Sequence, residues 1–438
     1  MTETVRRSLV RPVFMRWSLL AFALLIPVVV HAGWDYVEAR RFRQVVAEIR
    51  GRGEPVTLGD IRTRPAKTEA FRSDRYYRAA AVLASNRPQE QGFFERVRDA
   101  AWKGEWAGSL AEETRQQVGD REDALQLLDR AAPLTFEGFS NGTEAASLAL
   151  FPLARLAGLR TMLLAFDGDG DHAAASLYAE LRLRLVVEWA WPIFRAPIDE
   201  VDRVGRVLSS THPTSAALSG IGRALVDLDR DDALKMWFLR RRAALFNSTF
   251  GPGPFPNWAM NETVFDLVSF RGAVLGRVLG QPWLERQMRR RAETLSTVIA
   301  ALDQPWPERA GAAARVYEAL SSPPSELLRR PDVTMSKQIV DDLALVRVAR
   351  TVVAIERYRR EHGETMPARL DDLVPGYIDA VPVDPYSGRR LLFRTEARSY
   401  AVYSLGPNRR DDSGDFTLLR FAQAARESRD LGMRIQYR

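Results

Sequence analysis

The sequence contains no cysteine and is poor in histidine and lysine. The missing cysteine excludes disulfide frameworks, thiolate catalysis and zinc sites with cysteine ligands. Only four histidines are present, which argues against a metal site built from several of them: His31, His172, His212 and His362. The sequence also lacks an H-E-x-x-H motif, a P-loop and a G-x-G-x-x-G in a βαβ context. No motif commits the chain to a reaction, and we expect a protein that is not an enzyme.

The basic charge is almost entirely arginine. Only four of the 63 basic residues are lysines, and the net charge is +7. A nucleic-acid-binding protein would concentrate these charges on one face. Here arginines and acids are mixed along expected helices, as in 180–188 and 285–293. We interpret these stretches as solvated helix faces and expect no nucleic-acid partner.

The length and composition are those of a folded protein. A chain of 438 residues can form two or three domains with a sizeable core. Its 46% hydrophobic and 27% charged residues are typical of globular proteins, so wholesale disorder is not expected.

An uncharged segment follows the basic residues 1–16. It covers residues 17–34, begins at Trp17 and ends at Trp34, where interfacial aromatics belong. Eighteen residues extend about 27 Å as a helix, enough to cross a hydrocarbon core. The leading arginines favour an N-terminus in the cytoplasm and a body in the periplasm or outside, although Arg40, Arg41 and Arg43 follow on the other side. We predict a single-pass protein of the inner (cytoplasmic) membrane.

A cleaved signal peptide is the alternative. Val30-His31-Ala32 is an acceptable cleavage site after an apolar region of suitable length. Residues 35–50 nevertheless continue with helical apolar spacing and no break at this point. We therefore favour an uncleaved anchor, and either alternative exports the body.

The rest of the chain predicts a mainly α protein. We expect a helical stalk and linker over 35–70, an antiparallel helical array over 71–330, and a small α+β domain over 331–438. The clearest helices are 150–166 and 173–187, which are apolar at helical spacing and form an αα-hairpin. Further expected elements are helices at 198–208, 214–228, 232–246, 261–279, 282–302 and 340–361, and strands at 391–395 and 399–404.

Glycine and proline mark the expected breaks. The first long helix should end at 51–55, and 246–260 is too rich in these residues for a helix. Residues 250–258 could form an aromatic binding lip, but we favour a loop folded over the core by its own aromatic side chains. Residues 321–331 are interpreted as a linker to the C-terminal domain.

Asp167-Gly-Asp-Gly-Asp171 connects the two clearest helices. Alternate carboxylates can converge on calcium, but an EF-hand loop would need glycine and glutamate where His172 and Tyr178 stand. We favour a helix end at Gly168 or Gly170, followed by Asp171 as an N-cap.

Gly138-Phe-Ser-Asn-Gly142 matches the nucleophile-elbow pattern G-x-S-x-G. An elbow needs a buried strand before it, and the preceding 132–137 is short and contains proline and glutamate. Nothing in the sequence places a histidine beside Ser140. The alternative function is an exported hydrolase in the helical domain, with Ser140 or the acids of 167–171 at its site.

The C-terminal hundred residues carry a more specific pattern. It consists of a helix ending in Tyr358-Arg-Arg-Glu-His-Gly363, Leu370-Asp-Asp-Leu-Val-Pro-Gly-Tyr-Ile-Asp-Ala-Val-Pro-Val-Asp-Pro-Tyr386, Tyr400-Ala-Val-Tyr-Ser-Leu-Gly-Pro-Asn408 and Asp411-Asp-Ser-Gly-Asp415. This order resembles the globular end of type II secretion major pseudopilins. The resemblance implies a helix packed on a small sheet, and a link to secretion or pilus-type machinery.

The resemblance also implies a calcium site in the acidic loop. Carried over by motif, the candidate ligands are Asp411, Asp412 and Asp415, with Asn408 beside them. Two arginines, at 409 and 410, precede these acids and oppose a dication electrostatically.

The beginning of the chain departs from the pseudopilin pattern. A pseudopilin has a prepilin-peptidase site, Gly-Phe-Thr-Leu-x-Glu, directly before its apolar helix, whereas this chain has Pro12-Val-Phe-Met-Arg-Trp17. We therefore expect a permanent anchor and not a polymerised pilin. The complete layout looks like single-pass membrane proteins of Planctomycetes-type bacteria. We expect a helical scaffold or interaction module of the cell envelope, with envelope proteins as partners.

Overall fold

The computed structural model describes most of the chain outside several loops. The described residues are 3–62, 68–85, 92–94, 96–97, 100, 106, 108–136, 150–190, 199–250, 281–320, 326–415 and 429–437. The side chains of 3–24, and of some residues beside the gaps, lie outside this description. The predicted Ser140 elbow, the 251–258 part of the aromatic loop and the predicted helix 261–279 also lie outside it.

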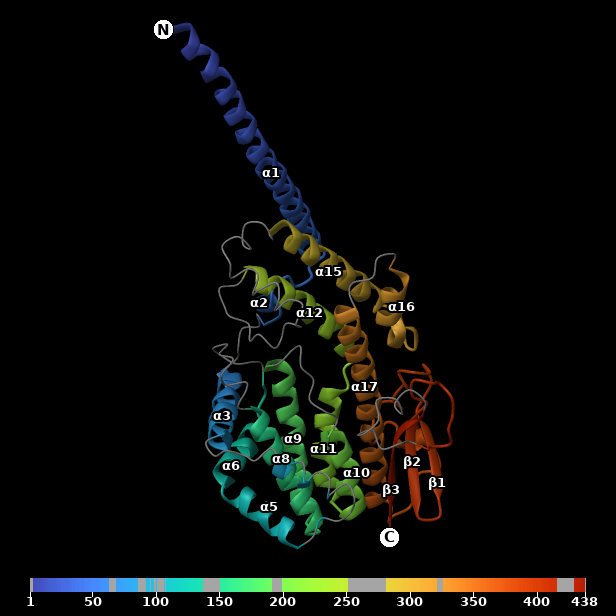
Figure 1. The fold of residues 1–438 in the computed structure, drawn as a ribbon. Coiled ribbons are helices and arrows are strands. Elements are labelled where there is room, and N and C mark those ends of the chain that lie inside the picture. Colours follow the sequence, from blue (N-terminus) through green and yellow to red (C-terminus); the bar gives the residue numbers. More distant parts are fainter. Residues whose placement is uncertain are drawn as a thin grey trace. The chain divides into compact units, whose positions relative to one another are not determined.

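The described residues are mainly helical and include one three-stranded antiparallel sheet (Figure 1). This confirms the predicted mainly α class with a small α+β part. The chain divides into two compact units. Unit 1 comprises 1–61, 238–300 and 316–331; unit 2 comprises 62–237, 301–315 and 332–438.

Unit 1 is built on the long helix α1, Glu3–Gly51. The helix runs without a break through residue 34 and ends at the predicted glycines, where Gly53 has a φ of 71°. Its second half packs against α15, Gln281–Ala301, and the end of α12, Ala233–Phe250. The core of unit 1 consists of Phe42, Val46, Ile49, Val56, Phe246, Met288 and Ala292. The short helix α2, Leu58–Arg62, follows α1.

Within the described part of the chain, no helix is long and apolar enough to cross a membrane.

The first part of unit 2 is a helical array. Its helices are α3 (Thr68–Ser85), α5 (Ser109–Gly119), α6 (Glu122–Ala131), α8 (Leu150–Phe166) and α9 (Gly170–Ala190). The antiparallel hairpin of α8 and α9 lies at its centre, because leucines on both helices are buried against α3 and α6. The predicted hairpin is thus confirmed, with α8 at the predicted bounds.

Three further helices continue unit 2: α10 (Asp199–Ser210), α11 (Ser215–Leu228) and α17 (Glu326–Glu361), the last of which starts in unit 1. Thr214 caps α11 by accepting a hydrogen bond from the N–H of Ala217 at 3.3 Å. Gly222 of α11 lies against Val353 of α17. α16 (Ala312–Ala319) also spans both units, after the short η2 (Glu308–Gly311).

The predicted linker was wrong at its end. Residues 326–331 already belong to α17, so this helix begins well before residue 340. Pro331 lies in its second turn, where it cannot donate the backbone N–H bond to the carbonyl of Leu327. Residues 321–325 lie outside the described residues.

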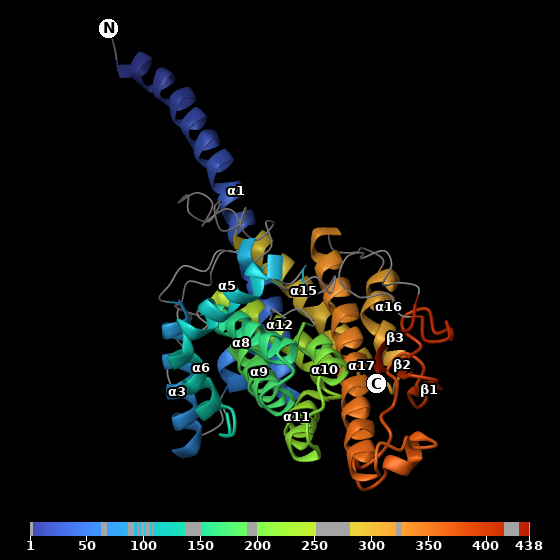
Figure 2. The ribbon, with the colours of Figure 1, turned by 90° about the horizontal axis from the view of Figure 1, so that it is seen from below.

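The sheet packs against α10, and its Tyr400 donates a hydrogen bond to Glu356 of α17 at 2.8 Å. Both ribbon views show the sheet beside α17 (Figures 1 and 2). Strand β2 (Ser399–Ser404) lies between β1 (Leu392–Glu396) and β3 (Leu431–Gln436), and Tyr400 of β2 pairs with Thr395 and Ile435. β2 is buried along its whole length. The short η3, Leu370–Leu373, lies before the sheet, at the predicted Leu-x-x-Leu turn. The third strand was not predicted.

Candidate functional site

The acidic loop leaves the end of β2. Gly406 opens it with a φ of 62°, and a Cβ atom there would lie 2.2 Å from the carbonyl oxygen of Arg429. Only glycine fits this close approach of two chain segments. The buried carboxylate of Asp384 holds the end of β2 in place. It accepts hydrogen bonds from the Ser404 hydroxyl at 2.6 Å and the Leu405 N–H at 3.2 Å.

Asp411 and Asp412 hold the loop itself together. Oδ1 of Asp411 accepts hydrogen bonds from the Ser413 N–H at 2.8 Å and the Tyr403 hydroxyl at 3.2 Å. Burial and the Asp411 charge raise the pKa of Tyr403 to about 12, so this phenol is a donor at neutral pH. The Asn408 amide donates to Asp412 Oδ2 at 2.9 Å. Asp415 instead pairs with Arg429 at 3.0 Å.

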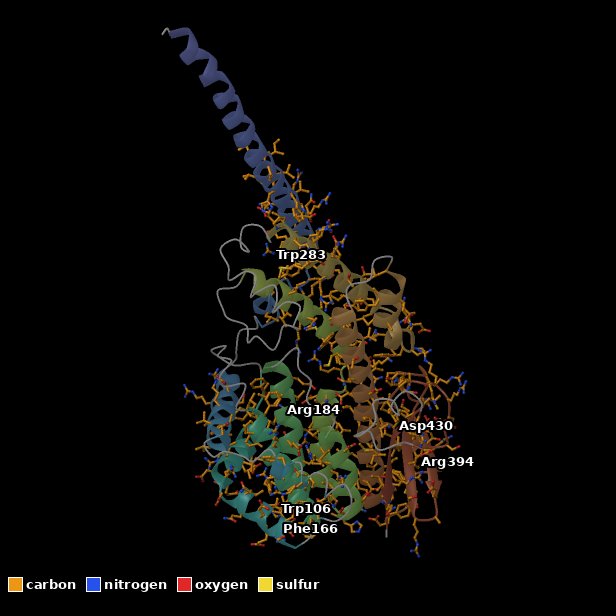
Figure 3. The ribbon with its side chains drawn as sticks, viewed as in Figure 1. Trp106, Phe166, Arg184, Trp283, Arg394 and Asp430 are labelled. Atoms are coloured by element: carbon orange, nitrogen blue, oxygen red, sulfur yellow. The ribbon has the colours of Figure 1, made fainter. Side chains whose placement is uncertain are left out.

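The sequence did not single out Asp430, which the fold brings to the same loop. It directly precedes β3 and is 1% exposed; Figure 3 places it at the sheet with Arg394. One carboxylate oxygen accepts the Gly414 N–H at 2.8 Å, whereas the described residues provide no hydrogen bond to the buried Oδ1. Burial raises the pKa of Asp430, and the charges of Asp412 and Asp411 add to this, against backbone hydrogen bonds that lower it.

The acids of this loop are accompanied by arginines, because Arg394 donates to the Ser413 carbonyl at 2.7 Å and Arg434 to the Gly414 carbonyl at 3.3 Å. Among the described side chains, no group of three or more acids or histidines is arranged to hold a metal ion. Of the three predicted ligands, Asp411 and Asp412 act electrostatically on Asp430, and Asp415 is engaged by an arginine. Asp430 escaped prediction because it lies far along the chain, next to the strand that was missed.

The acids between α8 and α9 have three different partners. Asp167 pairs with Arg115 at 2.7 Å, Asp169 accepts from the His172 N–H at 3.3 Å, and Asp171 accepts from the Thr214 N–H at 2.7 Å. The helix end at Gly168, with a φ of 79°, agrees with the favoured interpretation. The predicted N-cap was wrong by two residues: Asp169 caps α9, and Asp171 instead ties this turn to the start of α11.

No protein-family model, no curated protein and no solved structure matches this chain.

Proposed function

We propose that this chain is a non-enzymatic, membrane-anchored protein of the cell envelope. The N-terminal segment holds it in the cytoplasmic membrane, with the N-terminus inside and the body in the periplasm or outside. The helical array serves as a scaffold for envelope protein partners, and the C-terminal part is a pseudopilin-like domain linked to secretion or pilus-type machinery.

The observation that carries the proposal is a row of uncovered apolar side chains on α1. Between residues 25 and 30, five large apolar side chains are each more than half exposed: Leu25, Ile26, Val28, Val29 and Val30. Contiguous exposed apolar surface is unfavourable in water and is typical of membrane or protein contacts. Because this surface lies within the uncharged segment that ends at Trp34, a bilayer is the environment that suits it best.

The proposed pseudopilin-like domain rests on element order and packing. A long helix is followed by a short turn, two antiparallel strands and an acidic loop, the order that the resemblance implies. The Tyr400 hydroxyl donates to Glu356 of α17 at 2.8 Å, and Tyr386 likewise donates to Asp341 at 2.5 Å. These two tyrosines tie the segment after α17 back onto the helix.

Alkaline carbonate extraction of the full chain tests the anchor. We expect the chain to stay in the membrane pellet at its full-length mass. The pair Val28→Arg and Val29→Arg should release it, because each arginine costs about 3 kcal/mol in the hydrocarbon. The matched control places the same substitutions at two exposed valines of unit 2, Val82 and Val226, and should remain in the pellet.

Two outcomes would overturn the anchor. The first is extraction of the unaltered full-length chain into the supernatant. The second is a mature mass that lacks residues 1–32, which would establish the cleaved signal peptide.

A calcium site is a second element of the proposal. The buried Oδ1 of Asp430, to which the described residues provide no hydrogen bond, favours it. The candidate ligands are Asp411, Asp412 and Asp415, together with Asp430. Because no three of the described acids are arranged to hold an ion, the loop would have to rearrange on binding calcium, and Asp415 would have to leave Arg429. Bound calcium would supply the positive charge that these carboxylates lack and would stiffen the loop.

A further inference from the structure

Helices α1 and α15 lie side by side in unit 1 and run in the same direction. Near the start of the contact, Arg289 of α15 pairs with Glu38 of α1 at 3.4 Å. Further along both segments, the buried Arg242 links Ser296 of α15 at 2.9 Å to Glu54, just beyond α1, at 2.6 Å. From the first contact to the second, residue numbers increase in both segments. The first residues of α15 therefore lie toward the anchor end of α1.

This arrangement places a second tryptophan near the membrane end of unit 1. Trp283 precedes Arg289 by six residues, or about 9 Å along the helix, and Trp34 precedes Glu38 by four residues, or about 6 Å. Both indole rings are accessible, with Trp283 43% and Trp34 38% exposed. Figure 3 labels Trp283 at the beginning of α15.

Arginines surround these two tryptophans, and of the acids nearby only Glu293 of α15 is exposed, where it pairs with Arg289 at 2.9 Å. Arg40, Arg41 and Arg43 of α1 and Arg290 of α15 are exposed, and Arg286 is half-buried. Glu38 is buried, whereas Asp35 and Glu285 are half-buried. The accessible surface at this end of unit 1 is therefore aromatic and strongly basic. We call it the α1–α15 surface: Trp34, Arg40, Arg41, Arg43, Trp283, Arg286 and Arg290.

We propose that the α1–α15 surface binds anionic phospholipid headgroups of the membrane that holds α1. The proposal rests on the proposed function, because the anchor brings this surface to the bilayer. Arginine engages phosphate through two parallel N–H groups, and tryptophan favours the headgroup region. Each arginine near an anionic surface strengthens the attraction about fivefold. Headgroup binding also explains the presence of Arg40, Arg41 and Arg43. They lie on the external side of the apolar segment, whereas the arginines before it favour a cytoplasmic N-terminus.

The chemistry favours lipid over a protein partner. The basic surface is continuous with the exposed apolar row on α1. The binding partner must therefore present hydrocarbon at one edge and negative charge at the other. An anionic bilayer has both.

The absence of cysteine permits a direct test on the full chain in lipid nanodiscs. The variant Trp283→Cys carries an environment-sensitive fluorophore, and quenching by neutral acrylamide reports its accessibility. The matched control is Thr297→Cys, an exposed position on the same helix about 21 Å further from the anchor. The nanodiscs contain phosphatidylcholine alone or mixed with phosphatidylglycerol.

We expect the label at position 283 to be quenched several-fold less than the label at 297, and the difference to grow with phosphatidylglycerol. Equal quenching at both positions in inserted chains would overturn the lipid surface and leave the anchor intact. A chain that does not insert into either nanodisc would overturn the anchor and this inference together.

A charge reversal separates headgroup binding from simple proximity. Arg286→Glu with Arg290→Glu should remove the effect of phosphatidylglycerol on the label at 283. The matched control, Arg223→Glu with Arg398→Glu, reverses two exposed arginines of unit 2 and should preserve it. An unchanged phosphatidylglycerol effect in the first variant would contradict headgroup binding.

Discussion

At the residue scale, arginine neutralises several of the buried carboxylates of unit 2. Arg184 pairs with Asp342, Arg347 with Asp229 at 2.9 Å, and Arg359 with Glu356 at 2.8 Å. All six side chains are at most 7% exposed, so each pair satisfies charges that would be costly alone.

Asp430 differs, because within the described part of the chain it is hydrogen-bonded by backbone N–H groups and paired with no arginine. Its pKa is raised above the ordinary 3.8, mainly by burial. The contribution of this group to stability is therefore full below about pH 3.8 and is lost as the pH rises through the folded-state pKa. We expect Asp430→Asn, in calcium-free buffer, to raise the free energy of unfolding at pH 7, because it removes a buried charge.

The gain should vanish near pH 3, and urea unfolding at the two pH values measures it. The control Asp415→Asn removes an exposed carboxylate that pairs with Arg429 and should give no gain at neutral pH. A loss of stability from Asp430→Asn at pH 7 would contradict this account of the buried charge.

Bound calcium should offset the loss of folding stability that the buried charge of Asp430 causes. At a calcium concentration of a hundred times Kd, binding would stabilise the folded chain by about 2.7 kcal/mol, which for a chain of 438 residues corresponds to a rise in Tm of roughly 3 °C. The double variant Asp411→Ala with Asp412→Ala should lose this rise. If millimolar calcium does not raise the Tm of the unaltered chain, the chain has no such calcium site. If calcium raises the Tm of the double variant equally, calcium binds at another place.

Arg242 presents the opposite case, a fully buried cation in unit 1. Its partner Glu54 has a lowered pKa: burial would raise it, but hydrogen bonds from Arg52 and Arg242 outweigh burial. This stabilisation is present above the ordinary pKa near 4.5 and is lost as the pH falls through the lower folded-state value.

We expect Glu54→Gln to destabilise unit 1 by about 2 kcal/mol at pH 7, because it leaves the buried guanidinium without a counter-charge. Faster amide exchange in α15 measures the effect. Glu48→Gln, on the exposed side of α1, is the control and should leave exchange unchanged. Equal exchange in both variants would show that the pair contributes nothing.

At the scale of elements, helices with dense apolar spacing could be predicted from sequence, and those that depend on distant partners could not. α8 matched its prediction because leucines and alanines recur on its buried faces. β3 was missed because only its pairing with β2, across a long intervening segment, makes it a strand. The start of α17 was misjudged because Pro331 was taken as a break.

Gly406 joins two elements, and this defines another prediction. Gly406→Ala requires a φ that alanine disfavours, and its Cβ would meet the Arg429 backbone, so we expect a loss of about 3 kcal/mol. Gly376→Ala, with open space around its Cβ, should change stability by less than about 1 kcal/mol. Thermal unfolding that shows equal losses would contradict the assigned role of Gly406.

At the scale of the whole molecule, sequence reasoning found part of the candidate site. Asp411 and Asp412 were found through a local motif, whereas Asp430 joins them only through the pairing of β3 with β2. Local spacing cannot reveal residues that tertiary folding brings together. The proposed anchor, by contrast, corresponds to one continuous stretch of sequence, so its prediction required no tertiary information.

The central claim is that residues 17–34 hold the chain in a membrane with the body on the far side from the N-terminus. Spheroplasts carrying Thr2→Cys or Thr297→Cys, treated with a membrane-impermeant maleimide, test it most directly. The account predicts that both variants pellet with membranes, that Thr297→Cys reacts in intact spheroplasts, and that Thr2→Cys reacts only after permeabilisation. Equal reaction of both variants in intact spheroplasts, or recovery of the labelled chain outside the membrane fraction, would contradict it.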